Sequence, residues 1–160
     1  MSTNANCGRG DEPARSPEWE RVKNGHLQKE PRCVCCGRHW KAGTPVQVHH
    51  IFPFHYCVAL GRPDLELDQR NLITLCETEA GGTGQNHHLL VGHLDDFEAA
   101  NPRSRHDAAE KYLEKLAAVI RADPAWAAEV KERLPLLRQM SAQAKAALRR
   151  EMDERMPKGK

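Results

Sequence analysis

Three cysteines within four residues, in the segment Cys33-Val34-Cys35-Cys36-Gly37, constrain the fold of this chain more than any other feature. Cys33 and Cys36 form a C-x2-C pair, a spacing that lets two thiolates bind one zinc ion from a tight turn. Gly37 follows the pair and can adopt the backbone angles that such a turn needs. We therefore predict a zinc-binding knuckle here.

The composition indicates why a bound metal would matter. Apolar residues make up 39% of the 160 residues and aromatic residues 5%, while 29% are charged, so any hydrophobic core must be small. Such a core usually needs a metal or disulfide bonds. No apolar run reaches the roughly 18 residues of a membrane span, and residues 1–15 lack the apolar stretch of a signal peptide. We expect a cytoplasmic protein without membrane contact, whose cysteines bind metal rather than form disulfides.

One C-x2-C pair supplies two of the four ligands of tetrahedral zinc. Cys76, at the end of a predicted strand, is the candidate for the third ligand. His87, at the start of the following predicted helix, is the candidate for the fourth. Cys35 could replace either of its neighbours, so the ligand set stays open at that point. The alternative interpretation is that these are ordinary buried cysteines.

Two short strands and a helix are predicted in the middle of the chain. Residues 46–49 alternate between apolar and polar, as a half-buried strand does, and residues 71–76 form a second β-type run. A long loop punctuated by proline and glycine joins them. A helix over about 86–99 follows. We divide the chain into a disordered N-terminus (1–15), a small α+β domain (16–104) and a helical extension (105–160).

The helical extension is amphipathic. One apolar stripe covers residues 109–120, a second helix begins at Asp123-Pro124, and a third stripe covers 137–152 after a break at Pro135. We expect these stripes to pack on each other or on the α+β domain, although they would also suit a protein partner or self-association. No proposed ligand lies in this extension, so we expect the zinc site to be independent of it.

Charge is divided unevenly along the chain. Residues 17–100 carry 8 Lys and Arg against 11 Asp and Glu, a net of −3, whereas residues 101–160 carry 14 against 9, a net of +5. A protein that holds nucleic acid through a broad basic face shows a larger excess than this. Any nucleic-acid contact of the central part must be local or aided by the extension.

Several separated segments, in order over about 19–102, together resemble the HNH endonuclease family. They are the C-x2-C-Gly knuckle, Val48-His49-His50-Ile51 with Pro53, Asn71-Leu72-Ile73-Thr74-Leu75-Cys76, and Asn86-His87-His88 with Gly92-His93. The resemblance implies a ββα-metal fold, in which two antiparallel strands and one helix surround a divalent cation, here stapled by zinc. It also implies hydrolysis of DNA by a phage, mobile-element or defence enzyme.

The resemblance implies a role for individual side chains. His50 would be the general base, as a neutral imidazole with a pKa near 6.5 can take a proton from water. His49 and His88 would bind the catalytic cation, which could be Mg²⁺, Mn²⁺, Ni²⁺ or Zn²⁺. Asn71 would hold the loop that positions the base. His93 would be a further ligand or a phosphate contact.

One departure from the family pattern concerns the fourth zinc ligand. Many zinc-bearing relatives have Cys-His where this chain has His87-His88, and an interval of eleven residues separates Cys76 from His87. A histidine can replace the thiolate, which gives a Cys₃His site. The alternative function is a zinc-stapled nucleic-acid-binding module without catalysis, and a third is a structural zinc protein that binds a partner.

Overall fold

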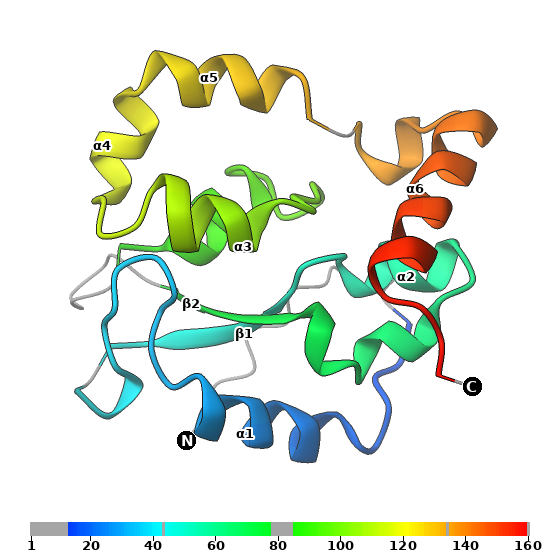
Figure 1. Cartoon of the computed structure of the whole chain (residues 1–160), viewed down its shortest axis with the longest axis horizontal. Helices are drawn as coiled ribbons and strands as arrows, with labels where there is room; N and C mark the ends of the chain where they lie inside the picture. The colour runs from blue at the N-terminus through cyan, green and yellow to red at the C-terminus, as the bar shows by residue number, and fades with distance from the viewer. Residues whose placement is uncertain (1–12, 43, 78–84, 134, 160) are drawn as a thin grey trace.

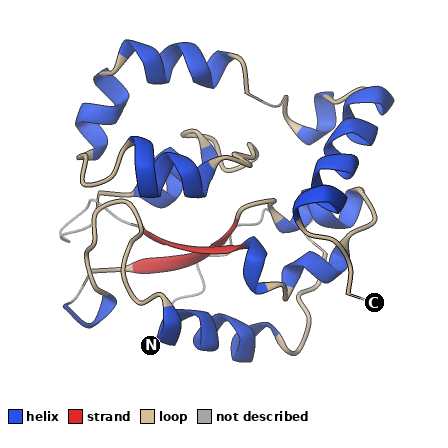
Figure 2. Cartoon of the chain, viewed as in Figure 1, coloured by secondary structure: helices blue, strands red, loops and turns tan. Residues whose placement is uncertain are grey.

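The structure is a computed structural model that describes residues 13–42, 44–77, 85–133 and 135–159. A two-stranded sheet lies at its centre, with α1 along one side and the later helices on the other (Figures 1 and 2). The helices and strands are α1 (Trp19–Lys29), η1 (Trp40–Ala42), β1 (Val46–His50), α2 (Phe54–Ala59), η2 (Pro63–Glu66), η3 (Gln69–Asn71), β2 (Leu72–Cys76), η4 (His88–Gly92), α3 (Ser104–His106), η5 (Asp107–Lys111), α4 (Ala117–Ala122), α5 (Pro124–Lys131), η6 (Leu137–Gln139) and α6 (Ala142–Arg155).

The sheet confirms the two predicted strands to within one residue at each end. β1 and β2 are antiparallel, and their register pairs Val46 with Cys76 and His49 with Ile73. Every residue of β2 is buried, because helices cover both faces of the sheet. The mixed α and β composition is therefore as expected. No helix in the described parts of the chain is long and apolar enough to cross a membrane.

The connection between the strands was predicted as a loop, and this prediction was wrong. It contains α2 and the two short helices η2 and η3. Tyr56 and Cys57 of α2, with Phe52 before the helix and Leu60 at its C-cap, are buried in one hydrophobic cluster. Burial of these side chains stabilises α2, which is short because it lies between Pro53 and Gly61.

The helix predicted over 86–99 is also shorter than expected. Only η4 (His88–Gly92) is helical there, and its geometry is that of a π-helix. Leu94 and Asp95 then have φ angles of 55° and 64°, in the left-handed region that ends a helix. η4 contacts both β1 and β2.

The predicted helix over 109–120 is interrupted in the same way. Its first residues belong to the end of η5, Glu114 has a φ angle of 64°, and α4 begins at Ala117. The start of α5 is as predicted, since the Asp123 side chain accepts a hydrogen bond from the Ala125 amide ahead of the first turn.

The described N-terminal region begins with a turn. The Ser16 carbonyl accepts the Trp19 amide at 3.0 Å, and α1 begins at Trp19. The disorder predicted for 1–15 falls mainly on residues 1–12, which lie outside the described residues. Arg15 is described, and its guanidinium lies 4.7 Å from the ring centroid of Phe54.

The hydrophobic core crosses the boundary that we predicted after residue 104. One cluster joins the knuckle and the sheet to Tyr112, Ile120 and Trp126. A second cluster joins the α2 region to Leu148 and Met152 of α6. The C-terminal helices therefore pack directly on the sheet and its connections, in agreement with the packing that we expected of their apolar stripes.

Candidate metal centres

The structure brings together the four side chains that the sequence suggested for zinc. The ligand atoms of Cys33, Cys36, Cys76 and His87 all lie within 4.8 Å of one another. Cys36 Sγ is 3.9 Å from Cys76 Sγ, and His87 Nδ1 is 3.3 Å from Cys76 Sγ. Two sulfurs on one tetrahedral zinc ion are about 3.8 Å apart, given Zn–S bonds of about 2.3 Å. These four residues could hold a metal ion, and the donor set fits zinc.

The knuckle is a tight turn held beside β2. Gly37 has a φ angle of 72°, and its amide donates to the Cys33 carbonyl at 2.8 Å. The Cys33 amide in turn donates to the Arg38 carbonyl at 2.9 Å. A third bond, from the Val34 amide to the Thr74 carbonyl, aligns the knuckle with the strand that ends at Cys76. The required positive φ explains the glycine after the cysteine pair.

His87 is oriented by the C-terminal part of the chain. Its Nε2–H donates to the Lys115 carbonyl at 2.9 Å, which leaves the Nδ1 lone pair directed at the sulfurs. Such a hydrogen bond on the far ring nitrogen is the usual way of fixing a metal-binding histidine. We had expected the zinc site to be independent of residues 105–160, and this contact shows that the extension supplies one of its supports.

Cys35, the alternative ligand, is not one of the four described residues whose ligand atoms converge. Its Sγ donates to the Tyr112 carbonyl at 3.3 Å, and its own carbonyl accepts the Glu114 amide at 2.7 Å. The middle cysteine therefore anchors the start of the C-terminal helices, while its neighbours form the cluster.

Cys76 is the thiol of the cluster that receives hydrogen bonds from several neighbours. Hydrogen bonds from Cys33 and Cys36 lower the pKa of the Cys76 thiol far below its usual value, although burial opposes them. The amides of Gln85 and His87 also donate to its sulfur, at 3.3 and 3.4 Å. A thiolate is the form that binds metal.

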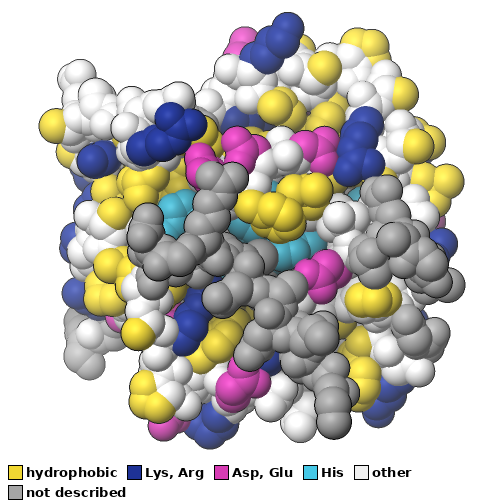
Figure 3. All heavy atoms as spheres, turned by 180° about the vertical axis from the view of Figure 1, so that it is seen from behind, with side chains coloured by type: hydrophobic (Ala, Val, Ile, Leu, Met, Phe, Trp, Pro, Cys, Tyr) yellow, Lys and Arg dark blue, Asp and Glu magenta, His cyan; other side chains and the backbone are white. Residues whose placement is uncertain are grey.

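A second cluster consists of His49, His88 and His93, and all three side chains are buried. Their ring centroids are 4.6 to 5.1 Å apart. Within the described residues, Nε2 of His49 and Nε2 of His93 are buried without a hydrogen-bond partner. Buried polar atoms that converge in this way are what a metal would satisfy. Figure 3 shows histidine side chains gathered in the middle of one face, beside hydrophobic and acidic side chains.

The π-helical geometry of η4 explains how His88 and His93 meet. In an α-helix, residues five apart are rotated by about 140° from one another, so their side chains diverge. A wider π-helical turn brings them back to one side. Gly92 completes the arrangement, because a Cβ atom there would lie 3.2 Å from Nε2 of His49.

All three histidines favour the neutral form that binds metal. Burial lowers the pKa of His49 well below its usual value, and the neighbouring His93 and His88 lower it further. Burial likewise lowers the pKa of His93 to about 4. Nδ1–H of His93 donates to the Ala99 carbonyl at 3.0 Å, which leaves the lone pair on the inward-facing Nε2.

His50 lies on the opposite face of the strand from His49. Its ring stacks on Trp19 with centroids 4.6 Å apart, and its Nε2–H donates to the Glu66 carbonyl at 2.9 Å, which leaves the lone pair on Nδ1. Burial, and then the charge of Arg15, lowers the pKa of His50 to about 3. This differs from the value near 6.5 that we expected, and it makes His50 neutral at physiological pH but a weaker base.

Asn71 holds both ends of the connection between the strands. Its Oδ1 accepts the Phe52 amide at 2.8 Å, and its Nδ2 donates to the carbonyls of Phe52 and Leu65, each at 3.1 Å. Leu65 precedes Glu66, whose carbonyl binds His50. The asparagine thus holds the loop whose Glu66 carbonyl orients this histidine.

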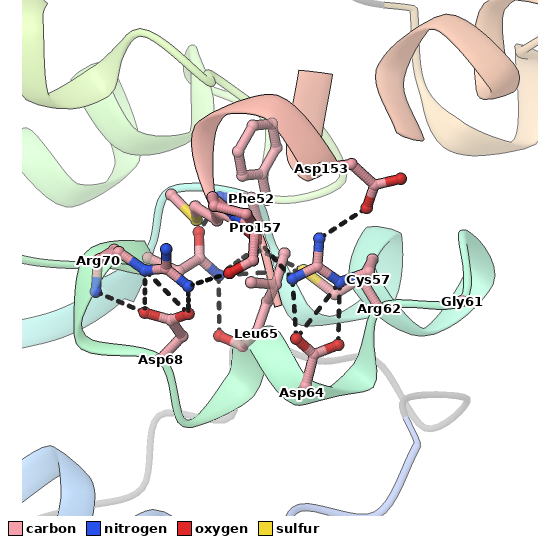
Figure 4. A network of polar contacts seen from close by, with 12 residues as sticks. Phe52, Cys57, Gly61, Arg62, Asp64, Leu65, Asp68, Arg70, Asp153 and Pro157 are labelled. Atoms are coloured by element: carbon pink, nitrogen blue, oxygen red, sulfur yellow. Dashed lines mark hydrogen bonds and ion pairs between the residues drawn. The ribbon is translucent and has the colours of Figure 1, made fainter. Parts of the chain in front are cut away.

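A buried arginine network that we did not predict holds the same loop through its contacts with the C-terminal residues. The fully buried Arg62 donates to Asp64, to Asp153 of α6 at 2.8 Å and to the Met156 carbonyl at 2.7 Å. Figure 4 shows its guanidinium between the two carboxylates. Arg70 adds a bond to the Pro157 carbonyl at 2.9 Å. The end of the chain is therefore fastened to the η2–η3 loop.

Comparisons with family models, with curated proteins and with solved structures found no match for this chain.

Proposed function

We propose that this protein is a metal-dependent endonuclease of the HNH type that hydrolyses phosphodiester bonds of DNA. The observation that carries the proposal is the cluster of three buried imidazoles at His49, His88 and His93, next in sequence to a histidine whose tautomer is fixed. Two adjacent histidines on opposite faces of one strand end suit two tasks, metal binding and proton transfer.

In this proposal His50 is the general base. Its Nε2–H is held by the Glu66 carbonyl, so the Nδ1 lone pair would accept the proton of a water that attacks phosphorus. Asn71 positions this base through the η2 loop. The lowered pKa keeps the ring neutral at physiological pH, which is the form that accepts a proton.

A divalent cation held by His49, His88 and His93 would supply charge neutralisation at the scissile phosphate and the leaving oxygen. Imidazole ligands suit Zn²⁺ and Ni²⁺, whereas Mn²⁺ and Mg²⁺ prefer oxygen ligands and would bind this set less readily. The cluster of Cys33, Cys36, Cys76 and His87 would hold a structural zinc ion. Its role would be to staple the knuckle to β2 and to the C-terminal helices.

One observation favours the alternative, a zinc-stapled nucleic-acid-binding module without catalysis. The His50 side chain is only 5% exposed and is covered by Trp19, so a water molecule would have limited access to it. In this alternative His50 is a buried structural residue and the protein binds DNA without cutting it.

Cleavage of supercoiled plasmid with added Mn²⁺, Ni²⁺ or Mg²⁺ separates the two functions. His50→Ala should lower cleavage by about 10²–10⁴-fold while zinc content and DNA affinity persist, because this change removes a base and no ligand. His88→Ala should also lose cleavage, and excess Mn²⁺ should partly restore it. His106→Ala, at an exposed histidine, is the matched control and should cut normally. A wild-type protein that binds plasmid but never cuts it would overturn the endonuclease proposal.

A further inference from the structure

A groove of about 810 Å³ lies between α1, β1 and the segment around η1. In Figure 1, α1 runs alongside β1 and the short helix η1 lies beyond one end of the strand. Among the described residues that line the groove, none belongs to either metal cluster. The groove is thus a separate surface feature, and its walls carry an unusual combination of aromatic and basic side chains.

Trp40 is the aromatic residue of this groove. Its side chain is 45% exposed, whereas Trp126 is buried and Trp19 is half-buried. The Trp40 amide donates to the Pro31 carbonyl, which fixes the backbone that presents the indole. An exposed indole face on a fixed backbone is a platform on which an unpaired base can stack.

Two lysines lie on the walls of the groove. Lys23 comes from α1 and Lys41 from η1, where its Nζ lies 5.6 Å from the Trp40 ring centroid. Slight burial, and then the charges of Arg32 and Lys41, lowers the pKa of His39 at the same rim, in keeping with a locally positive surface. Because residues 17–100 carry a net charge of −3, we expected any nucleic-acid contact of this part of the chain to be local, and these two lysines form such a local basic patch.

The nearby carboxylates are engaged in contacts with other side chains. Glu77 accepts a hydrogen bond from Nε2 of Gln47 at 2.7 Å, and Glu20 pairs with Nζ of Lys23 at 3.0 Å; the Glu20 side chain is 61% exposed and the Lys23 side chain 12%. Because the carboxylate of this pair faces solvent, where ion pairs contribute only about 0–1 kcal/mol, a phosphate in the groove could compete with Glu20 for the Lys23 ammonium group.

Two residues that line the groove, Lys23 and Val48, share a face of their element with residues at the His50 site. Trp19 and Lys23 are four residues apart and therefore lie on one face of α1, and Trp19 stacks on His50. On the facing strand, Val48 lines the groove, and His50 follows two residues later on the same face, about 7 Å away. The spacing is close to one nucleotide of an extended strand.

We propose that this groove binds an unpaired nucleic-acid strand, with one base stacked on Trp40 and backbone phosphates beside Lys23 and Lys41. We further infer that the strand continues to His50, a step that rests on the proposed endonuclease function. Binding in the groove itself does not depend on cleavage.

The test is fluorescence anisotropy with the full-length, zinc-loaded protein and no other added metal. The probe is an oligodeoxythymidylate of about twelve nucleotides, compared with a blunt duplex of equal length. The single strand should bind more tightly. Trp40→Ala should weaken its binding by about five- to a hundred-fold, the loss of one stacked base, and Trp40→Phe should retain most of the affinity. Lys41→Glu should lower the salt slope by about 0.7 for the lost phosphate contact.

Leu113→Ala and Lys131→Glu, exposed positions outside the groove, are the matched controls and should bind as the wild type does. Affinity unchanged by both Trp40→Ala and Lys41→Glu would overturn the groove proposal, as would equal affinity for single strand and duplex. Absence of any nucleic-acid binding would also overturn it and would leave the groove to a protein segment. If the single strand binds in the groove but plasmid is not cleaved, the result would support the groove proposal and contradict the endonuclease proposal.

Discussion

Nε2 of His87 lies 2.9 Å from the carbonyl oxygen of Lys115, and this hydrogen bond ties the candidate zinc cluster to the C-terminal helices. The tie is reinforced by the Glu114 amide, which donates to the Cys35 carbonyl inside the knuckle. The two contacts come from consecutive residues at a turn with a positive φ angle at Glu114. The turn that interrupts the predicted helix is therefore the element that supports the cluster.

A chain truncated after residue 104 should consequently lose its zinc. Truncation removes the acceptor that orients His87 and the buried side chains of Tyr112, Ile120 and Trp126. Metal analysis of the purified protein measures the loss. Lys115→Ala is the control, because it keeps the carbonyl and should retain a full equivalent of zinc. A truncated protein that also retains one equivalent would show that the contact is dispensable.

Cys36→Ser and Cys35→Ser should behave differently. Cys36 contributes a ligand atom to the cluster, and structural zinc contributes on the order of 10 kcal/mol to the folding of small zinc domains, so its loss should unfold the region around the knuckle. Cys35 donates instead to the Tyr112 carbonyl, a bond that a serine hydroxyl can replace. Zinc content and thermal unfolding should therefore separate the two variants. Loss of zinc from Cys35→Ser alone would make Cys35 the ligand.

The sequence predicted the parts of the fold that depend on local pattern. The strands were evident because Val46 and Val48 alternate with polar residues, and the start of α5 because Asp123 precedes a proline. The set of three cysteines and His87 was suggested by residue type and spacing, and the set of three histidines by the resemblance to the HNH family; the structure gathers both. Their roles as ligands remain predictions.

The sequence could not predict what depends on tertiary contacts. The break at Glu114 follows from a backbone angle that a glutamate rarely adopts, and nothing in the 109–120 stripe indicates it. Nothing in residues 86–99 indicates that the predicted helix is only the short π-helical segment η4. The burial of Arg62 could not be predicted from the residues around it, because its partners Asp153 and Met156 lie more than ninety residues away in the sequence.

Asn71→Asp should lower the rate of plasmid cleavage but leave the zinc content unchanged. The carboxylate keeps an acceptor for the Phe52 amide but loses the Nδ2 donors to the Phe52 and Leu65 carbonyls. The Phe52 carbonyl keeps the Cys57 thiol as a donor, whereas loss of the bond to the buried Leu65 carbonyl costs about 1–3 kcal/mol. The loop that presents the Glu66 carbonyl to His50 should loosen, with zinc content unchanged. Plasmid cleavage and denaturant unfolding measure the two effects, and normal cleavage by this variant would remove Asn71 from the site.

The Glu30 carboxylate should make stability depend on pH. Burial alone would raise the pKa of Glu30, but hydrogen bonds from His26 and Arg105 outweigh it and lower the pKa to about 2. Because the folded-state pKa is lowered, the stabilisation is fully present above pH 4.5 and is lost as pH falls toward 2.

Glu30→Gln should therefore lose on the order of 3 kcal/mol at pH 7 and much less near pH 3. The measurement is the free energy of unfolding in urea, determined for the wild type and for Glu30→Gln at each pH. The difference between the two proteins is compared, because loss of metal in acid affects both equally. Glu20→Gln, at a side chain that is 61% exposed, is the control and should change little. A constant difference across the pH range would contradict the assignment.

Gly92→Ala should weaken the three-histidine site and spare the zinc. An added Cβ would lie 3.2 Å from both Cε1 and Nε2 of His49 and 3.3 Å from Cδ1 of Leu75, so the His49 ring must shift by a few tenths of an ångström. Displacing a metal ligand by disturbing its surroundings typically costs 10- to 100-fold in metal affinity. Titration with Co²⁺ or Ni²⁺ after zinc loading measures this affinity. Gly25→Ala is the control, since nothing lies within 4 Å of its added Cβ in α1, and it should leave affinity unchanged while stabilising the helix by up to about 1 kcal/mol. If Gly92→Ala binds the second metal as tightly as Gly25→Ala does, His49 is not a ligand of that metal.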